Sequence, residues 1–581
     1  MKNLLIYLKE YIKESIIAPF FKLLEASFEL IVPLVMAAII DSGIANSDKA
    51  YIYKMSAILV LLAAVGFACS VIAQYFAAKA AVGFSTALRH ALFEHIESLS
   101  FSEMDTIGTS TLITRMTSDI NQVQTGVNMV LRLFLRSPFI VFGAMIMAFT
   151  VNVKGALIFV VTIPLLSIVV FGVMLITIPM FKKVQASLDK VLNRTRENLE
   201  GARVIRAFDK QSNEIDNFNK ENSFLTNMQL VVGRVSALMN PVTFIIINCA
   251  TIAVIWVGAG QVFDGIISRG EVVALVNYMS QILVELVKLA NLIILITKSI
   301  ACGNRIQEVL EVEPSIVSRT SEYVQPVEGA DAVEFINVGM KYMGASEESL
   351  SNMNFQIKKG QTVGIIGGTG SGKSSLVHLI PRFYDASSGE IKIDGVNIKD
   401  YPINQIRDKV GIVMQKAVLF KGTIAQNLRW GNADATDEEL WKAIEIAQAT
   451  DVVNGKEEKL DYEIEQGGRN LSGGQRQRLT IARALVKDPD ILILDDSASA
   501  LDFATDARLR AALRQMQGDK TIFIVSQRTS SIQFADKIIV LDDGNIVGIG
   551  THNELLINCD IYREIYESQF KKEDIMKGAN R

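Results

Sequence analysis

The sequence is poor in the residues that build disulfide-bonded or zinc-binding domains. Its only cysteines are Cys69, Cys249, Cys302 and Cys559, and no two of them form a C-x-x-C pair. We therefore expect free thiols, with neither a disulfide framework nor a zinc site. The formal net charge of −4 is small, so composition gives no reason to expect a nucleic-acid partner. Residues 1–13 lack a small-residue cleavage pattern, so we expect no removable signal peptide.

Hydrophobic residues, in contrast, are abundant. They make up 50% of the chain, and the mean hydropathy is +0.29. These values are high for a soluble protein and low for a protein buried entirely in lipid. A chain of 581 residues is also too long for one ordinary domain. A membrane-embedded half joined to a soluble half explains both observations.

Six apolar stretches before about residue 300 are long enough to cross a hydrocarbon core that is about 30 Å thick. We predict membrane helices at Ile16–Ile40, Ser56–Ala78, Val130–Phe149, Gly155–Ile178, Pro241–Gly260 and Val272–Ile296. Two of the intervening gaps, Lys79–Met129 and Pro179–Asn240, are much longer than the other three. Within the second long gap, apolar residues recur at helical spacing over Lys182–Phe208, which contains no proline. We therefore expect long helical extensions of the membrane helices.

Lysine and arginine are unevenly distributed around these spans. Sixteen lie in the N-terminal segment and the two long gaps, and only four lie in the short gaps. The four are Lys49, Lys54, Lys154 and Arg269. The positive-inside rule then predicts a multi-pass protein of the cytoplasmic membrane, in contact with lipid, whose N-terminus and long gaps are cytoplasmic.

Few charged residues lie within the predicted spans. They include Glu25, Glu29, Arg132, Arg136, Glu285 and Lys288. An intramembrane charge is a candidate functional site. Simpler structural roles are also open, because Arg132 and Arg136 lie near a helix start and could extend to the membrane surface. Glu285 and Lys288 are three residues apart on one helix and could pair with each other.

After about Glu311 the composition becomes that of a soluble α/β domain. An apolar strand at Val363–Ile366 runs into a G-x-x-x-x-G-K-S loop and then into a predicted helix. This phosphate-binding segment consists of Gly367, Gly368, Thr369, Gly370, Ser371, Gly372, Lys373, Ser374 and Ser375. Its backbone amides can surround phosphate, Lys373 can contact the β- and γ-oxygens, and the Ser374 hydroxyl can bind Mg²⁺. The sequence thus predicts a site for ATP and Mg²⁺.

A second apolar strand, Ile491–Leu494, ends in Asp495 and Asp496, about 120 residues after the phosphate-binding loop. A buried strand that ends in aspartate next to such a loop commonly supplies a second Mg²⁺ contact. We assign this contact to Asp495.

Between these two segments lies the sequence Leu471, Ser472, Gly473, Gly474 and Gln475. This LSGGQ segment resembles the signature sequence of the ATP-binding cassette (ABC) transporters. The resemblance extends over the whole chain and is closest to exporters of the multidrug type. It implies an all-α, six-helix transmembrane domain at 1–311, a linker at 312–331 and an α/β P-loop cassette at 332–581.

The resemblance also implies roles for single residues. Tyr342 resembles the aromatic residue that stacks on adenine, and Gln415 resembles the glutamine that reaches Mg²⁺. Asp502 belongs to the loop that crosses to a partner cassette. In this family two cassettes close head to tail, so Leu471–Gln475 is expected to cap the ATP of the partner. Ser100–Ile107 and Arg206–Asn213 match the short coupling helices in position.

Two positions depart from the family pattern. Active cassettes carry glutamate where this chain has Asp496, and histidine where it has Gln527. Aspartate is one methylene shorter than the glutamate that orients the attacking water, and a displacement of about 1 Å can cost on the order of 10²-fold in rate. Gln527 can donate a hydrogen bond but cannot become a cation. With its binding elements intact, the chain resembles the subunit of a bacterial heterodimeric exporter whose own ATP site is degenerate.

The resemblance leaves three assemblies open. The first is one half of a heterodimeric exporter of hydrophobic or amphipathic compounds, paired with a second, different half-transporter. The second is a homodimer that works slowly with two Asp/Gln sites. The third is a nucleotide-gated channel or regulatory subunit on the same fold. The sequence favours the first, because the signature is intact while both chemical positions are altered.

Overall fold

The computed structural model describes residues 2–516 and 520–569 of the chain. Within this part, the chain divides into two compact units. The first, here called the membrane unit, contains the residues up to 97 and residues 110–312. The second, here called the cassette unit, contains residues 98–109 and the chain from residue 313 onward. Residues 98–109 thus belong to the cassette unit, although helices of the membrane unit flank them on both sides in the sequence.

The described residues of the membrane unit form helices joined by short turns, with no strand among them. Its elements are η1 (Lys2–Tyr11), α1 (Ile12–Ala38), η2 (Ile39–Ile44), α2 (Lys49–Ser98), α4 (Thr109–Thr114), η3 (Arg115–Asp119), α5 (Ile120–Leu133), α6 (Arg136–Val151), α7 (Val153–Glu200), α8 (Ala202–Ala207), α9 (Gln211–Ala237), α10 (Met239–Phe263) and α11 (Arg269–Leu310). Six continuous helical segments are long and apolar enough to cross a membrane. They are Asn3–Ile44, Lys49–Ser98, Thr109–Val151, Val153–Glu200, Gln211–Phe263 and Arg269–Leu310. The prediction of six membrane helices with long helical extensions is confirmed.

Local sequence explains where several of these helices begin and end. Ser268 caps α11, and its hydroxyl accepts a hydrogen bond from the Glu271 amide in a reciprocal capping box. At the far end of α7, Gly201 separates that helix from α8, and Asp209 then turns the chain with a φ of 51°. The short helix between α7 and α9 is therefore Ala202–Ala207, which begins earlier than the expected Arg206–Asn213.

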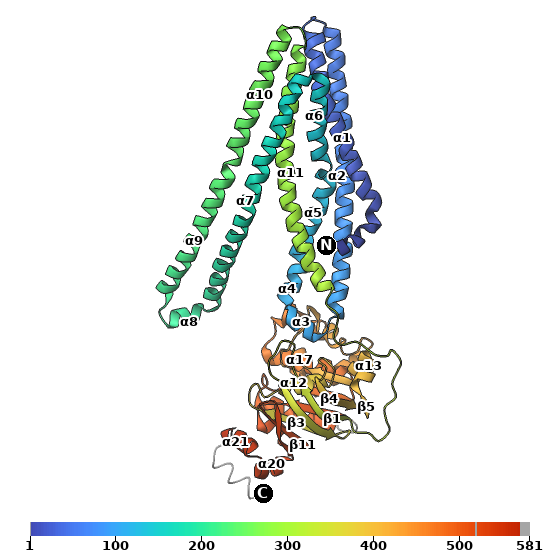
Figure 1. The fold of residues 1–581 in the computed structure, drawn as a ribbon. Coiled ribbons are helices and arrows are strands. Elements are labelled where there is room, and N and C mark those ends of the chain that lie inside the picture. Colours follow the sequence, from blue (N-terminus) through green and yellow to red (C-terminus); the bar gives the residue numbers. More distant parts are fainter. Residues whose placement is uncertain (1, 517–519, 570–581) are drawn as a thin grey trace. The chain divides into compact units, whose positions relative to one another are not determined.

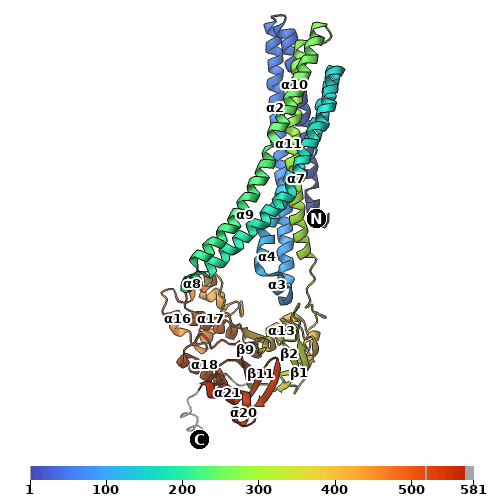
Figure 2. The same cartoon turned by 60° about the vertical axis from the view of Figure 1, so that its left-hand side comes forward.

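The core of the membrane unit is formed by α1, α6, α7, α10 and α11. Ala26, Phe159, Val254, Tyr278 and Ile282 are among its fully buried members. Both views show α9 continuing into α10 and running beside α7 (Figures 1 and 2). Many apolar side chains on the outer faces of these helices remain exposed, which suits a surface that contacts lipid.

The cassette unit is built on strands, and its sheets have the order β2-β1-β4-β5, β12-β11-β3-β10-β9-β6 and β7-β8. The strands are β1 (Val333–Met340), β2 (Leu350–Ile357), β3 (Thr362–Gly367), β4 (Ser388–Ile393), β5 (Val396–Asn397), β6 (Val410–Val413), β7 (Gly422–Thr423), β8 (Glu463–Ile464), β9 (Ile491–Asp495), β10 (Thr521–Val525), β11 (Lys537–Asp542) and β12 (Asn545–Gly550). In the six-stranded sheet all neighbouring strands pair in parallel except β11 and β12. The predicted fold class, a six-helix domain followed by an α/β cassette, is confirmed.

Helices cover these sheets and form a separate helical region (Figure 2). They are α3 (Phe101–Ile107), α12 (Lys373–Leu379), η4 (Ile398–Asp400), α13 (Ile403–Lys409), α14 (Ile424–Leu428), α15 (Asp437–Ile446), α16 (Thr450–Asn454), η5 (Lys459–Asp461), η6 (Gln466–Gly468), α17 (Gly473–Val486), α18 (Phe503–Gln515), α19 (Thr529–Ile532), α20 (His552–Asn558) and α21 (Asp560–Gln569). In Figure 2, α16, α17 and α18 lie toward one end of this unit, and β1 and β2 lie toward the other.

Residues near the start and near the end of helix α3 contact other parts of the cassette unit. The Ser100 hydroxyl caps α3 and also accepts a hydrogen bond from the Ile316 amide at 3.1 Å. Phe101 stacks on Phe383, and the Tyr384 hydroxyl donates to Asp105 Oδ2 at 2.6 Å. These contacts explain why residues 98–109 group with the cassette unit.

The parallel strands bring their carboxyl ends to one edge of the six-stranded sheet. The register pairs Val525 with both Ile365 and Asp495, and it pairs Val413 with Leu494. The segments that follow β3, β6, β9 and β10 therefore emerge side by side, at the edge where parallel α/β sheets bind their ligands.

Candidate nucleotide site

The loop after β3 wraps around the Lys373 ammonium group. Lys373 Nζ donates to the backbone oxygens of Gly367 at 3.1 Å and Gly368 at 2.6 Å. Gly372, which caps α12, has a φ of 90°, and a Cβ at this position would lie 2.8 Å from the Ser349 oxygen. Only glycine fits both this backbone and this contact. Burial lowers the pKa of Lys373, although the charges of Asp496 and Asp495 partly oppose this effect.

Two oxygen ligands of the kind that Mg²⁺ prefers lie at the start of α12 and the end of β9. Ser374 Oγ donates to Asp495 Oδ1 at 3.0 Å, and Asp495 is 1% exposed. A hydroxyl and a carboxylate within hydrogen-bonding distance of each other can bind a divalent cation together. The lysine and the glycine-rich loop beside them suit the phosphate that would accompany this cation. The donor set therefore fits the expected Mg²⁺ and nucleotide.

A cavity of about 760 Å³ opens at this edge of the sheet. Its volume lies in the range of pockets that bind small ligands. Its lining includes these predicted site residues: Tyr342, Thr369, Gly370, Gly372, Lys373, Ser374, Ser375, Gln415, Asp495, Asp496 and Gln527. Gly367, Gly368 and Ser371 belong to the loop behind this lining. The structure thus brings together residues that lie as far apart in the sequence as Tyr342 and Gln527.

Tyr342 lies at one wall of the cavity, and its hydroxyl is 2.9 Å from the Ser375 hydroxyl. Its ring makes an edge-on contact with Tyr384, with centroids 5.2 Å apart. Tyr384 also forms a hydrogen bond with Asp105 of α3, so a single side chain, that of Tyr384, links Tyr342 to α3.

Asp496 follows β9 in a left-handed conformation, with a φ of 45°. Its Oδ2 accepts a hydrogen bond of 3.4 Å from Gln415 Nε2. Burial, reinforced by the charge of Asp495, raises the pKa of Asp496 above the ordinary aspartate value. The two altered positions, Asp496 and Gln527, line the same cavity.

The signature residues, by contrast, are not part of this cavity lining. Ser472 caps α17 in a capping box with Gln475, and the Ser472 amide donates to Gln475 Oε1 at 2.9 Å. Leu471 is buried, whereas Ser472 and Gly473 are exposed. A Cβ on Gly474 would lie 3.0 Å from the Ala500 oxygen. The exposed start of α17 presents free backbone donors of the kind that bind phosphate.

Asp502 has a defined role within the chain. It caps α18, where its carboxylate accepts hydrogen bonds from the Thr505 amide at 2.9 Å and the Thr505 hydroxyl at 2.8 Å. The bond from the Thr505 amide, followed by that from its hydroxyl, lowers the pKa of Asp502. Like the signature, Asp502 is not part of the cavity lining.

Sequence reasoning missed several groups at the cavity. Asp543 and Gly544 line it at the β11–β12 turn, with φ values of 40° and 73°. An Asp-Gly pair between two strands is a recognised hairpin signal and could have located this turn. His378 is not part of the lining, but its Nε2 lies 3.3 Å from Oδ2 of Asp495, which lines the cavity. Its position four residues after Ser374 on α12 could have placed it on the same helix face.

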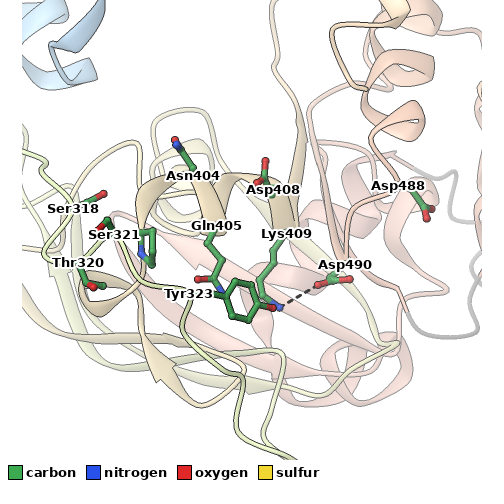
Figure 3. A pocket seen from close by; sticks show the side chains of 11 residues that line it. Ser318, Thr320, Ser321, Tyr323, Asn404, Gln405, Asp408, Lys409, Asp488 and Asp490 are labelled. Atoms are coloured by element: carbon green, nitrogen blue, oxygen red, sulfur yellow. Dashed lines mark hydrogen bonds and ion pairs between the residues drawn. The ribbon is translucent and has the colours of Figure 1, made fainter. Parts of the chain in front are cut away.

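A second polar cavity of about 580 Å³ in the cassette unit lies beside the linker, and Ser318, Thr320 and Tyr323 line it together with residues of the cassette (Figure 3). Gln405 forms two hydrogen bonds with the Val324 backbone, at 2.9 and 2.7 Å. Lys409 Nζ donates to Asp394 at 2.7 Å and to Asp490 at 3.2 Å. This cavity shares no lining residue with the nucleotide cavity, and its contacts fasten residues near 324 to the sheet.

Four charged residues of the membrane unit form a network around the buried Arg136 and Glu285. Arg136 bonds to Glu285 at 2.7 Å and to Glu29 at 2.6 Å, and Lys288 bonds to Glu285 at 2.8 Å. The Ser137 hydroxyl also donates to Glu285, at 2.8 Å. The expected pairing of Glu285 with Lys288 is confirmed. The suggestion that Arg136 extends to the membrane surface is wrong, because its side chain is buried between two carboxylates.

Part of this network faces a cavity of about 480 Å³ between α1 and α11. Glu29, Glu285 and Lys288 line it, together with the polar Asn277, Ser280 and Gln281 and the apolar Val32, Pro33, Met36 and Val284. The side chains of Glu29 and Lys288 are 41% and 44% exposed, so both can contact a molecule in the cavity.

Comparison with known proteins agrees with this geometry. The model of the ABC transporter transmembrane region matches residues 15–286, and the ABC transporter model matches residues 350–499. The chain is 36% identical over 573 residues to YfiB, an uncharacterized ABC transporter ATP-binding protein of Bacillus subtilis, with 99% of each chain covered. It is 32% identical over 501 residues to an ATP-dependent lipid A-core flippase of Hahella chejuensis, which covers 86% of this chain and 85% of the flippase.

A solved structure supports the fold independently. A bacterial Atm1-family ABC exporter with ATP bound superposes with a TM-score of 0.78 over 97% of this chain and 99% of the exporter. The two sequences are 22% identical, so this similarity establishes the fold alone. Together with the full-length relatives, the matched models show that the chain belongs to the ABC transporter family, with the membrane and ATP-binding domains of the exporter type in one polypeptide.

Proposed function

We propose that this chain is one half of a heterodimeric ABC exporter that moves hydrophobic or amphipathic compounds across the cytoplasmic membrane. The observation that carries the proposal is that the predicted nucleotide-binding residues fall into two groups, only one of which lines the cavity. The cavity gathers one set of nucleotide-binding residues, whereas Leu471–Gln475 and Asp502 are not part of its lining. A chain that holds ATP on one side only needs a second cassette to close each site.

In the proposed site, each element of the cavity contacts one part of Mg–ATP. The loop 367–375 surrounds the phosphates, and Tyr342 stacks on the adenine. Ser374, Asp495 and Gln415 hold Mg²⁺, which neutralises charge on the phosphates when it is bound. Lys373 contributes a positive charge whose other partners are neutral backbone oxygens.

We further propose that this site binds ATP but hydrolyses it slowly. Asp496 is one methylene shorter than glutamate, so its carboxylate cannot reach the position from which glutamate orients the attacking water, and a displacement of about 1 Å can cost on the order of 10²-fold in rate. Gln527 cannot supply the positive charge of a protonated histidine. Efficient hydrolysis is then assigned to the other site, in which this chain supplies Ser472–Gln475 to the ATP held by a different half-transporter.

Two substitutions test the asymmetry in complexes with a co-expressed partner half-transporter. Gly474→Asp places a carboxylate against the γ-phosphate of the partner's ATP, and such repulsion in a closed interface costs several kcal/mol. Transport should nearly vanish. Asp496→Asn alters a site that contributes little turnover, so its effect on ATPase activity and efflux should be modest.

The control for this test is Gly474→Ala. It adds the Cβ that would approach the Ala500 oxygen but no charge, so it measures the steric part of the effect. If Asp496→Asn is as damaging as Gly474→Asp, the two sites are equivalent. A slow homodimer would then replace the heterodimer.

The proposed orientation can be tested by labelling. We propose that the N-terminus, the segment near α8 and the cassette are cytoplasmic, because lysine and arginine are concentrated on that side. Cysteines introduced at Ser47 and Ser212, both exposed, can be probed on intact cells in a cysteine-free background. An impermeant reagent should label position 47 and spare position 212, and the reverse pattern would reject this orientation.

The cargo is proposed to be amphipathic, because the cavity between α1 and α11 combines charged and apolar walls. The similarity to a lipid A-core flippase supports the same class of compound. Binding of an amphipathic fluorophore, measured with and without Glu29→Gln, tests whether this cavity receives cargo. Unchanged affinity would place the cargo elsewhere.

A further inference from the structure

The last described residue of α21, Gln569, is bonded to the loop that carries Gln527. Gln569 Oε1 accepts hydrogen bonds from the Thr529 amide at 2.9 Å and from the Thr529 hydroxyl at 3.0 Å. Gln569 Nε2 donates to the backbone oxygen of Gln527 at 2.7 Å. One side-chain amide therefore contacts three polar groups of residues 527–529.

These bonds supply hydrogen-bond partners that the start of α19 otherwise lacks. Helix α19 starts at Thr529, and its N-cap residue, Arg528, provides no side-chain hydrogen bond to the helix. Thr529 is fully buried, so water cannot readily take the place of a lost partner for its amide. Gln569 thus caps α19 from outside.

The position of Gln569 is fixed by the packing of α21. Tyr562 on α21 is fully buried in a cluster with Leu555, Ile532 and Ile366, and its hydroxyl lies 2.7 Å from His552 Nδ1. This cluster joins α20 and α21 to α19 and to β3, the strand that leads into the phosphate-binding loop. Packing at Tyr562 therefore anchors α21 beside α19, and the end of α21 contacts the loop after β10 through Gln569.

We infer that Gln569 is a positioning residue for the nucleotide site and acts through Gln527. Its bond to the Gln527 oxygen fixes the peptide that follows Gln527, and the Gln527 side chain lines the cavity. The inference rests on the proposed function, in which Gln527 contacts the γ-phosphate. Gln569 then contributes to the preference of this site for ATP over ADP.

The substitution Gln569→Glu keeps the hydrogen bonds with Thr529 and removes the one with the Gln527 oxygen. A carboxylate still accepts the two bonds from Thr529, but it turns an oxygen toward the Gln527 oxygen and repels it. Glu567→Gln is the matched control, because Glu567 is an exposed residue on the same helix. Affinities for Mg–ATP and Mg–ADP are measured on the full-length chain in nanodiscs, together with thermal midpoints.

We expect Gln569→Glu to lower the ratio of ATP to ADP affinity about fivefold, which corresponds to the loss of one hydrogen bond of ordinary strength. Gln527→Ala should lower the ratio similarly, and the double variant should show no further loss, because both act through one contact. Glu567→Gln should leave the ratio unchanged.

Three results would overturn the inference. An unchanged ratio in Gln569→Glu would do so, even if the thermal midpoint falls, because the contact would then be purely structural. Additive losses in the double variant would show that Gln569 acts independently of Gln527. An Mg–ATP affinity that Lys373→Ala leaves unchanged would reject the nucleotide site itself, and this failure is distinguishable from the other two.

Discussion

Arg136 in the membrane unit and Lys373 in the cassette unit are both buried cations, yet they have different partners. Arg136 lies between the carboxylates of Glu285 and Glu29. Lys373 donates to two backbone oxygens, and no ion pair of Lys373 within 4 Å is found among the described residues. One cation is neutralised by the protein, and the other is solvated by neutral groups.

This difference separates a structural charge from a binding charge. A buried ion pair leaves little net field for a ligand, and breaking it exposes an unpaired charge to a poorly solvated interior. A cation whose hydrogen-bond partners are all neutral, as the two carbonyls and the Ser371 hydroxyl are for Lys373, keeps its field for an anionic ligand such as phosphate. Substitution of Arg136 should therefore affect folding most, and substitution of Lys373 should affect binding most.

The largest expected effect is on stability, from Arg136→Met. It leaves the Glu285 carboxylate, which is 3% exposed, with only Lys288 and Ser137 as polar partners. Removing one partner of a buried pair costs about 3–5 kcal/mol. The measurement is the thermal midpoint of the chain in nanodiscs, and ATP affinity measured below that midpoint should not change.

The double variant Arg136→Met with Glu285→Met provides the control for this prediction. It removes both charges of the pair, so most of the lost stability should return. If the double variant is less stable than Arg136→Met alone, the pair does not behave as a neutralised structural unit, and the comparison with Lys373 fails.

The next effect is on binding, from Lys373→Ala. Loss of a charged donor to phosphate should weaken Mg–ATP affinity about 100-fold. Stability should change little, because Lys373 has no ionic partner whose charge would be left unpaired. Isothermal titration of the full-length chain measures the first quantity, and a thermal scan measures the second. A large loss of stability with unchanged affinity would reverse the assignment of the two cations.

A smaller gain in rate is expected when both altered positions are restored. Asp496→Glu with Gln527→His lengthens the acceptor by one methylene and supplies a titratable donor. In the complex with a partner half-transporter, the part of the ATP turnover that Lys373→Ala removes should rise about tenfold to a hundredfold. Adding Lys373→Ala should abolish the gain. No increase in turnover would mean that these two positions do not limit the site.

Much of this organisation was predictable because it depends on local pattern. Six apolar runs predicted six membrane helices, since a span needs a minimum length of apolar sequence. The strand that leads into Gly367–Ser375 predicted the loop at a sheet edge, since glycines and lysine at fixed spacing leave few alternatives. Family resemblance added Tyr342 and Gln415, which no local pattern would have selected.

The long-range contacts had no such pattern. Arg136 and Glu285 are 149 positions apart, and only folding brings them together. Resemblance to a coupling helix singled out Ser100–Ile107, but the contacts of Phe101 and Asp105 that join residues 98–109 to the cassette unit have no pattern in that segment. The contact of Gln569 with Gln527 was equally invisible, because a glutamine near the end of a helix usually faces solvent.

The smallest expected effect tests what makes a buried charge structural. The alternatives are its ionic partners and its location in the membrane unit rather than in the cassette unit. Asp394 lies in the cassette unit but is paired as Arg136 is, with Lys409 at 2.7 Å and Lys359 at 2.9 Å. Burial opposes the ionisation of Asp394, but the hydrogen bonds from the two lysines outweigh it and lower its pKa. If partners decide, Asp394→Asn should reduce stability and leave ATP affinity unchanged.

The expected loss is about 1–2 kcal/mol at pH 7, because Lys359 is half exposed and Lys409 keeps its contact with Asp490. Asparagine has nearly the same shape and tolerates the φ of 50° at this position, so the change removes charge with little strain. A lowered folded-state pKa stabilises the protein above the ordinary aspartate pKa of about 4, and the benefit disappears as the pH falls through the folded-state value. Thermal midpoints of the variant and the unaltered chain should therefore differ at pH 7 and converge below about pH 4. A difference that persists at low pH would assign the loss to shape, and a change in ATP affinity would show that location matters more than partners.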